Sequence, residues 1–310
     1  MIAQIKVGVI GVGHLGKEHA RIYSQLPGCE LVGIHDLNVK AAEAVGKKTR
    51  CRIFPSAREL AAGVDAVSVV VPTVAHRDAA RIFLEQGKDV FIEKPIAETT
   101  AQAEELVRLA RQKGVLLQVG HIERFNPVLS FLEKNLHEPR FIEAHRLSPY
   151  PGRGTDVSVI LDLMIHDLDV LLHLVRSPLV SFDAVGVSVL SKSEDIANAR
   201  LKFANGCVAN ITTSRISPEK MRKIRVFSSD SYISLDYQNQ EGLVYWKEDG
   251  AIKRDKVPVT KDEPLKLELA SFLESVRRRS EPRVSGEEGK RALDVAVAII
   301  EQIRRGQSPS

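Results

Sequence analysis

The 310-residue chain has an ordinary globular composition, with 44% hydrophobic and 27% charged residues, so wholesale disorder is excluded. Its formal net charge of +4 is spread among interspersed acidic residues, which argues against nucleic acid as a partner. A chain of this length predicts two domains.

The cysteines and the hydropathy indicate the compartment. Cys29, Cys51 and Cys207 are widely separated and form no CxxC pair, so we expect reduced thiols and neither a disulfide framework nor a zinc site. No apolar run reaches about 18 residues, and the N-terminus lacks the basic region of a signal peptide. We therefore expect a cytoplasmic protein with no membrane partner.

The first part of the chain alternates short apolar runs with helical patterns. The runs predicted as strands are Ile5–Ile10, Glu30–His35, Asp65–Val71, Asp89–Ile92 and Val115–Val119. Several are continuously apolar, as strands covered by helices on both faces should be. This rhythm predicts a doubly wound parallel sheet over residues 1–119.

After residue 120 the rhythm changes to a second domain, 120–310. Helices are predicted near Pro127–Leu136, Val157–Val175, Glu263–Arg279 and Gly286–Arg305, the last one with a capping box formed by Ser285 and Glu288. Strands are predicted at Phe141–Leu147, Val180–Leu190, Ala197–Phe203, Cys207–Ser214, Lys223–Ser228, Tyr232–Tyr237, Gly242–Lys247 and Ile252–Val257. Successive hairpins indicate a largely antiparallel sheet, and hence an α+β domain.

A glycine motif, Gly11-Val12-Gly13-His14-Leu15-Gly16, follows the first strand and opens a helical pattern. Strand, glycine turn and helix together are typical of a Rossmann dinucleotide site. Gly11 permits the tight turn, Gly13 lets the backbone approach a diphosphate, and Gly16 allows close packing of the helix. The diphosphate would lie at the positive end of that helix.

Asp36 ends the second strand, about 25 residues after Gly11. A carboxylate at this point accepts hydrogen bonds from the ribose hydroxyls of NAD and repels the 2′-phosphate of NADP. The sequence therefore favours NAD, while the nearby Lys40 leaves NADP open as an alternative.

Two further segments follow strands at the same edge of the sheet. In Pro72-Thr73-Val74-Ala75-His76, Thr73 is either the N-cap of an ordinary surface helix or part of a contact with the cofactor. Glu93-Lys94-Pro95 ends the fifth strand and places an ammonium where the nicotinamide should lie. Lys94 can stabilise the negative charge that develops on a substrate oxygen as hydride leaves. A cis bond before Pro95 would aim Lys94 into the cleft.

Asp162 and His166 lie four residues apart in the segment Val157–Val175, so both project from one helical face. The imidazole has a suitable intrinsic pKa for accepting a proton near neutrality, and a carboxylate one turn away orients it. A solvated acidic helix is the alternative, since Asp167 and Asp169 flank His166. No further ligands with metal spacing accompany them, so no metal site is expected.

The polar segment Gly120-His121-Ile122-Glu123-Arg124-Phe125-Asn126-Pro127 follows the last strand of the first domain. It either contributes to the substrate pocket or caps the helix that starts at Pro127. Arg124, Arg146 and Arg153 are candidate donors for a substrate diphosphate, and Arg153 lies in a predicted loop.

The ordered motifs GVGHLG, PTVAH, EKP, VGHIERFNP and LDLMIHDLD resemble the Gfo/Idh/MocA oxidoreductase family over nearly the whole chain. The resemblance implies hydride transfer between a sugar or polyol carbon and a nicotinamide. It also implies an open-faced second sheet through which homodimers or homotetramers form. Lys94, Asp162 and His166 match the family's catalytic positions, with His166 as the base and Lys94 as substrate positioner or proton relay.

The expected site follows from the motifs and this resemblance together. The cofactor-binding set is Gly11, Gly13, His14, Leu15, Gly16, Asp36, Pro72, Thr73, His76, Glu93 and Lys94. The substrate-binding set is Lys94, His121, Arg124, Asn126, Arg153, Asp162 and His166.

Three functions are consistent with that site. The segment VGHIERFNP is similar to the family branch of UDP-N-acetylglucosamine 3-dehydrogenases, which implies a sugar-nucleotide substrate. A dehydrogenase of inositol, another polyol or a monosaccharide is the first alternative. A non-catalytic NAD-binding regulator is the second, because a fold alone never proves a function.

Overall fold

The chain folds into two units, each built around its own β-sheet. The computed structural model describes residues 4–150 and 157–307. The first unit comprises Met1–Ile122 and Glu263–Arg291, and the second comprises Glu123–Asp262 and Ala292–Ser310. The expected boundary after residue 119 lies within three residues of this division, but Glu263–Arg291 belongs to the first unit and not, as we expected, to the second.

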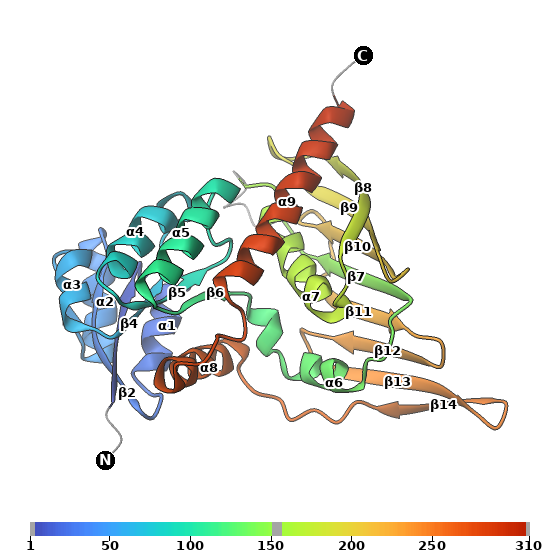
Figure 1. Cartoon of the computed structure of the whole chain (residues 1–310), viewed down its shortest axis with the longest axis horizontal. Helices are drawn as coiled ribbons and strands as arrows, with labels where there is room; N and C mark the ends of the chain where they lie inside the picture. Colours follow the sequence, from blue (N-terminus) through green and yellow to red (C-terminus); the bar gives the residue numbers. More distant parts are fainter. Residues whose placement is uncertain (1–3, 151–156, 308–310) are drawn as a thin grey trace. The chain divides into compact units, whose positions relative to one another are not determined.

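The first unit holds six parallel strands in the order β3-β2-β1-β4-β5-β6, which is the Rossmann order (Figure 1). Its strands are β1 (Ile5–Ile10), β2 (Cys29–His35), β3 (Arg52–Ile53), β4 (Ala66–Val69), β5 (Asp89–Glu93) and β6 (Leu117–Gly120). Its helices are α1 (Gly16–Tyr23), α2 (Val39–Thr49), α3 (Ala57–Gly63), α4 (Thr73–Glu85), α5 (Thr100–Lys113) and α8 (Pro264–Arg278).

Apolar contacts explain why α8 belongs to this unit although it lies far along the chain. Leu269 and Phe272 are fully buried in the same core as β1 and α1. The Phe272 ring meets Phe91 of β5 edge to face at 5.8 Å, and Phe91 meets His19 of α1 in the same way at 5.3 Å. Burying such side chains contributes roughly 1.5–3 kcal/mol each, so α8 is part of this core.

The second unit contains eight strands in the order β14-β13-β12-β11-β7-β10-β9-β8. They are β7 (Phe141–Leu147), β8 (Leu179–Val187), β9 (Ile196–Phe203), β10 (Val208–Ser214), β11 (Met221–Phe227), β12 (Ser231–Asp236), β13 (Glu241–Glu248) and β14 (Ala251–Lys256). All neighbours are antiparallel except β7 and β10. The helices are η1 (Ile122–Phe125), which begins at the division, α6 (Pro127–Asn135), η2 (Ile160–Met164), α7 (Ile165–Val175) and the part of α9 (Gly286–Gln307) that follows Arg291.

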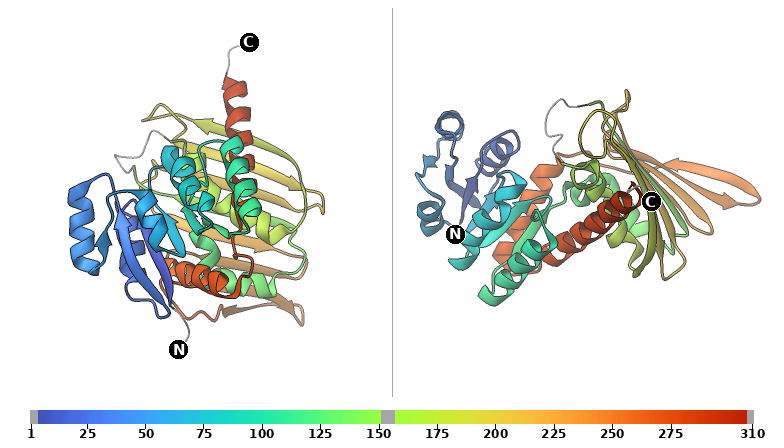
Figure 2. Two further views of the ribbon diagram at one scale, coloured as in Figure 1. Left: turned by 60° about the vertical axis from the view of Figure 1, so that its left-hand side comes forward. Right: turned by 90° about the horizontal axis from the view of Figure 1, so that it is seen from above.

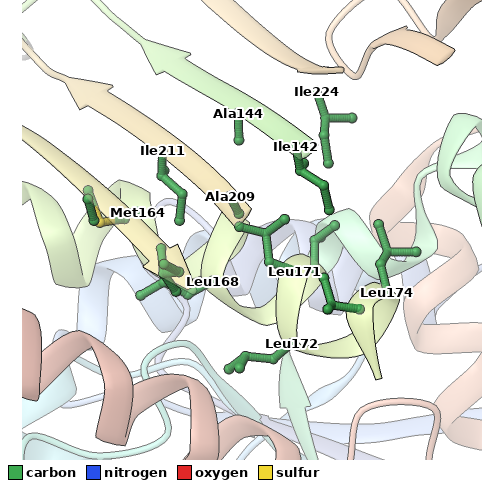
Figure 3. Packing of buried hydrophobic residues seen from close by; sticks show 14 of the residues in the cluster. Ile142, Ala144, Met164, Leu168, Leu171, Leu172, Leu174, Ala209, Ile211 and Ile224 are labelled. Atoms are coloured by element: carbon green, nitrogen blue, oxygen red, sulfur yellow. The ribbon is translucent and has the colours of Figure 1, made fainter. Parts of the chain in front are cut away.

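One face of this sheet carries the second core. Figure 3 shows Leu168 and Leu171 of α7 facing the strands that carry Ile142, Ala209 and Ile211. The strands alternate buried and more exposed residues, as β9 and β10 do, because successive side chains point to opposite faces. The helices α7 and α9 lie on one side of the sheet (Figure 2).

Helix ends in the structure test two of the expected caps. The Ser285 hydroxyl accepts the Glu288 N–H at 3.3 Å, and the Glu288 carboxylate accepts the Ser285 N–H at 3.0 Å, so the predicted capping box at α9 is confirmed. The prediction of Thr73 as an N-cap is wrong, because α4 already begins at Thr73 and Pro72 is its N-cap. Across the described parts of the chain, no helix combines the length and apolarity needed to cross a bilayer.

Candidate active site

The glycine motif forms a tight loop between β1 and α1. Gly11 has a φ of +77°, and a Cβ on it would lie 2.5 Å from the Val70 carbonyl oxygen. A Cβ on Gly16 would lie 1.8 Å from the Gly11 carbonyl oxygen. A Cβ on Gly13, in contrast, would meet nothing within 4 Å. Gly11 and Gly16 are therefore required by the protein's own backbone, while Gly13 leaves space next to the helix N-terminus.

Asp36 lies beside this loop at the end of β2. Its carboxylate accepts the Val12 N–H at 2.6 Å and the Asn38 N–H at 2.7 Å. These two bonds hold the carboxylate at the carboxyl edge of the sheet. The next side chain, Leu37, is 93% exposed.

These residues fit a nicotinamide dinucleotide. The open space at Gly13 and the exposed His14 and Leu15 leave room for a diphosphate at the N-terminus of α1. The Asp36 carboxylate can accept bonds from ribose hydroxyls, and the apolar Leu37 suits the face of an adenine.

His76 was expected beside the cofactor, but its ring is 1% exposed and lies between two backbone carbonyls. Nδ1 is 2.8 Å from the Pro95 oxygen, and Nε2 is 2.9 Å from the Val71 oxygen. Burial lowers the pKa of His76 against the opposing effect of these carbonyls. The imidazole therefore joins the end of β4 to the segment that follows β5, and no ring nitrogen is left for a cofactor.

Glu93 is the last residue of β5, and Lys94 follows it directly. The Glu93 side chain is 12% exposed and turns inward, with Oε1 3.1 Å from His19 Nε2 and Oε2 3.2 Å from the Lys94 N–H. Burial raises the pKa of Glu93, but His19 and Lys94 together, through their hydrogen bonds and charges, outweigh burial and the pKa is lowered. Lys94 is half-buried and its bond to Pro95 is cis, as expected. Glu93 was expected to contact the cofactor, but its carboxylate is bonded to His19 and to the Lys94 N–H instead.

In the second unit, Asp162 and His166 occupy the start of the helical segment. Asp162 lies in the π-helical turn η2, and His166 is the second residue of α7. Both side chains are half-buried, and buried Ile160, Met164 and Ile165 surround them in sequence. Single π turns occur frequently at functional sites. This turn could not be predicted from the sequence, because the spacing of apolar residues does not distinguish i+4 from i+5 hydrogen bonding.

A buried ionic network anchors the same turn of α7. Arg146 of β7 is 3% exposed and donates to both oxygens of Asp167, at 2.8 and 2.9 Å, and to Glu123 at 2.9 Å. Arg124, 2% exposed, donates to Asp169 at 3.3 Å. These arginines were candidate donors for a substrate diphosphate. Both guanidinium groups are instead buried against carboxylates, and the flanking acids of His166 are not solvated.

The remaining predicted substrate residues divide into three cases. Asn126 is 3% exposed, and its side chain accepts the Val128 N–H at 3.4 Å, so it caps α6 as the alternative interpretation held. Its amide also donates to the Tyr237 carbonyl at 3.0 Å. His121 is 1% exposed at the end of β6. Arg153 lies outside the described residues.

Within each unit, the predicted residues thus divide into side chains that are at least partly exposed and side chains that are buried. The first unit brings the glycine loop, Asp36 and Lys94 to the carboxyl edge of its sheet, and the second brings Asp162 and His166 into one helical turn. Of the supporting residues, His19 lies outside every motif, whereas Glu123 and Asp167 lie within the motifs VGHIERFNP and LDLMIHDLD. Their role as buried partners was not predicted, because it is set by tertiary packing. Over the described ranges, no group of three or more His, Cys, Asp or Glu side chains is placed to hold a metal ion.

Comparison with known proteins gives the class to which this fold and site belong. A model described as an oxidoreductase family with an NAD-binding Rossmann fold matches residues 5–121, and the GFO/IDH/MocA C-terminal domain matches residues 133–234. The chain belongs to the Gfo/Idh/MocA family of NAD(P)-dependent dehydrogenases that act on CH–OH groups.

Within this family, the chain is similar to dehydrogenases of known substrates. The chain is 36% identical to UDP-N-acetylglucosamine 3-dehydrogenase of Acidithiobacillus ferrooxidans, over 95% of this chain and 96% of that protein. The solved structure of that enzyme superimposes with a TM-score of 0.93, covering 97% of this chain and 98% of its own. Inositol 2-dehydrogenase of Rhizobium meliloti is 26% identical over 96% of this chain and 97% of its own length.

A more distant structure shares the fold. A levoglucosan dehydrogenase, solved in complex with NADH and levoglucosan, has a TM-score of 0.89 at 16% identity, covering 97% of this chain and 98% of its own. Likeness at this identity concerns the fold alone.

Proposed function

We propose that this chain oxidises the 3-hydroxyl of UDP-N-acetylglucosamine with NAD. The observation that carries the proposal is the 36% identity, spread over 95% of the chain, to a relative of that name. The chain also has Lys94, Asp162 and His166 at the positions expected of a hydride-transferring site.

The glycine loop and Asp36 would hold the NAD cofactor. Bound NAD supplies the acceptor for the hydride that leaves the sugar carbon. The Asp36 carboxylate favours NAD because it repels the 2′-phosphate of NADP, although Lys40 keeps NADP as the alternative cofactor.

We propose that Lys94 and His166 both act on the reacting hydroxyl. His166 takes the hydroxyl proton, and Asp162 orients the imidazole and stabilises its charged form. Lys94 donates a hydrogen bond to the same oxygen and stabilises the charge that develops on it. In the reverse assignment, Lys94 takes the proton. The pH profile of kcat should then change more in Lys94→Ala than in His166→Ala, whereas our assignment predicts the larger change in His166→Ala.

The diphosphate of the substrate needs a donor at the rim of the pocket. Because Arg124 and Arg146 are occupied by buried carboxylates, we propose Arg153 for this role. Arg153→Ala should then raise KM for the sugar nucleotide by about 10-fold or more and leave turnover of a free sugar unchanged.

A polyol dehydrogenase is the second candidate, favoured by the 26% identity to inositol 2-dehydrogenase over nearly the full length of both chains. The test is NADH absorbance at 340 nm with UDP-N-acetylglucosamine, free N-acetylglucosamine and myo-inositol, each with NAD and NADP. We expect NADH from the sugar nucleotide with NAD. Turnover of myo-inositol alone would favour the second candidate, and no turnover with normal NAD binding would favour a regulator.

The catalytic residues are tested in the same assay. Lys94→Ala and His166→Ala should each lower kcat by at least about 10²-fold, because each removes a group that acts in the transition state. The exposed Lys113→Ala and His137→Ala serve as matched controls and should keep wild-type rates.

We also propose that two or four copies associate through the face of the second sheet opposite α7 and α9. Four neighbouring strands carry an aromatic row on that face, with the Phe227 and Tyr232 rings 4.5 Å apart and the Tyr232 and Tyr245 rings 5.0 Å apart. Phe141 extends the row at 5.8 Å from Phe227. A second copy of the same surface would bury these rings.

A further inference from the structure

Two buried histidines contact the Glu93-Lys94-Pro95 segment from different helices. His19 of α1 is 0% exposed and its Nε2 lies 3.1 Å from Glu93 Oε1. His76 of α4 contacts the Pro95 carbonyl at 2.8 Å. Since a carboxylate can only accept, His19 is the donor in its bond to Glu93. His76 has a carbonyl at each ring nitrogen, and its neutral form donates to one of them. The residues before and after Lys94, Glu93 and Pro95, are therefore each in contact with a buried histidine.

The His19 contact continues to the backbone of Lys94. The second oxygen of Glu93 accepts the Lys94 N–H at 3.2 Å, so one carboxylate joins the imidazole to the lysine backbone. Gly120 of β6 provides the space for this carboxylate, because a Cβ there would lie 3.0 Å from Glu93 Oε2. His19 and Lys94 together lower the pKa of Glu93 despite its burial, so the group is a carboxylate at neutral pH.

Helix α1 links this pair to the proposed diphosphate site. Gly16, whose close packing shapes the glycine loop, is the first residue of α1, and His19 follows it by three residues on the same short helix. A displacement of the N-terminal turn of α1 would therefore be transmitted through His19 and Glu93 to Lys94. A core built only for stability would favour an apolar pair, because burying a hydrogen-bonded ionic group costs desolvation free energy.

We propose that His19 and Glu93 form a positioning pair that sets the Lys94 side chain and connects it to the cofactor-binding helix. The inference rests on the proposed function, in which Lys94 contacts the substrate. His19 and Glu93 act through Lys94 and are positioning residues, whereas Lys94 itself is catalytic.

The first test compares variants on α1. His19→Leu should lower kcat about 10- to 100-fold, because small misplacements of a catalytic group carry costs of that order. The KM for the sugar nucleotide and the Kd for NADH should change less than about 3-fold, and His19→Gln, which keeps a side-chain N–H, should restore much of the rate. Tyr23→Phe is the matched control, since it removes a buried hydrogen bond of the same helix to Ser68, away from Glu93.

The second measurement does not depend on turnover. Acetic anhydride labels lysines at a rate set by their environment, and mass spectrometry reports the rates of Lys94 and Lys113 separately. We expect His19→Leu to change the Lys94 rate more than about 3-fold and to leave the Lys113 rate unchanged, whereas Tyr23→Phe changes neither. If His19→Leu does not fold, Glu93→Gln replaces it with the same expectation.

The outcomes separate the two proposals. Loss of kcat and altered Lys94 labelling in His19→Leu but not in Tyr23→Phe supports the positioning pair. Equal behaviour of the two variants overturns it. If wild-type protein turns over no substrate, the proposed function fails, and the Lys94 labelling still decides the positioning pair.

Discussion

Asp195 is the most densely hydrogen-bonded carboxylate described in the second unit. It is 0% exposed, and one oxygen accepts the N–H groups of Val189, Leu190 and Ser191 at 2.6–2.9 Å. The other accepts Arg215 Nε at 2.9 Å and the Ser191 hydroxyl at 2.7 Å. Burial raises the pKa of Asp195, but these bonds outweigh burial and the pKa is strongly lowered.

Asp195→Asn should therefore lower the free energy of unfolding by about 3 kcal/mol at pH 7, because it leaves Arg215 buried without its carboxylate. A carboxyl with a depressed pKa stabilises the fold above its unfolded pKa of about 3.9, and this contribution is lost as the pH falls through the folded pKa. Urea unfolding at pH 7, 5 and 3 measures the difference, which should be full at pH 5–7 and smaller at pH 3. The exposed Asp183→Asn is the control. A difference that is absent, or equal at all three pH values, would contradict the interpretation.

At the same scale, the sequence predicted where site residues lie but not which way they point. Glu93 and Lys94 both follow a strand that ends at the carboxyl edge of the sheet, so both were placed in the cofactor site. Adjacent residues of an extended chain face opposite sides, and Glu93 faces the interior with Phe91. His76 is a similar case, because only packing shows that its ring faces two carbonyls.

At the scale of elements, the loop between β1 and α1 has two glycines with separate roles. The space around Gly16 is filled by the protein's own backbone, whereas the space around Gly13 is open. A methyl group at each position therefore has different consequences for the fold and for the bound nucleotide.

Gly16→Ala should destabilise the protein by about 2 kcal/mol or more, because its Cβ overlaps the Gly11 carbonyl oxygen. Gly13→Ala should change the unfolding free energy by less than about 0.5 kcal/mol and weaken NADH binding by about 10-fold or more, because it fills the space left for the diphosphate. Urea unfolding and NADH fluorescence titration measure the two effects. Wild-type NADH affinity in Gly13→Ala would place the diphosphate elsewhere.

Most elements were predictable because their apolar periodicity is strong. Phe141–Leu147 alternates along its length and was predicted with the observed bounds. The two-residue strand β3 was missed, since Arg52 and Ile53 carry no pattern. The π turn at Ile160–Met164 was expected as α-helix, because an apolar segment fits either hydrogen-bonding scheme.

At the scale of the whole molecule, the position of a segment in the sequence did not predict to which of the two units it belongs. Residues 263–291 follow the antiparallel strands in sequence, and we assigned them to the second domain for that reason. Their apolar side chains, such as Leu269 and Phe272, complete the core of the first unit instead. Helical periodicity shows that a face is buried and does not show against which sheet.

The proposed association of two or four copies through the aromatic row of the second sheet can be tested by the mass of the protein in solution. Sedimentation should give at least twice the 34.3 kDa of one chain. The double variant Tyr232→Glu/Tyr245→Glu should sediment as a monomer, because it places charges in the buried row. The control Lys134→Glu changes an exposed residue of α6. A wild-type monomer, or an unchanged double variant, would contradict assembly through this surface.

In the function we propose, Lys94 and His166 act on one substrate hydroxyl beside the nicotinamide. A crystal structure of the protein with NADH and UDP-N-acetylglucosamine tests it most directly. We expect the Lys94 ammonium and a His166 ring nitrogen both to lie within about 3.5 Å of the sugar 3-hydroxyl oxygen. A complex in which either group lies more than about 6 Å from that oxygen, with no water joining them, would contradict it.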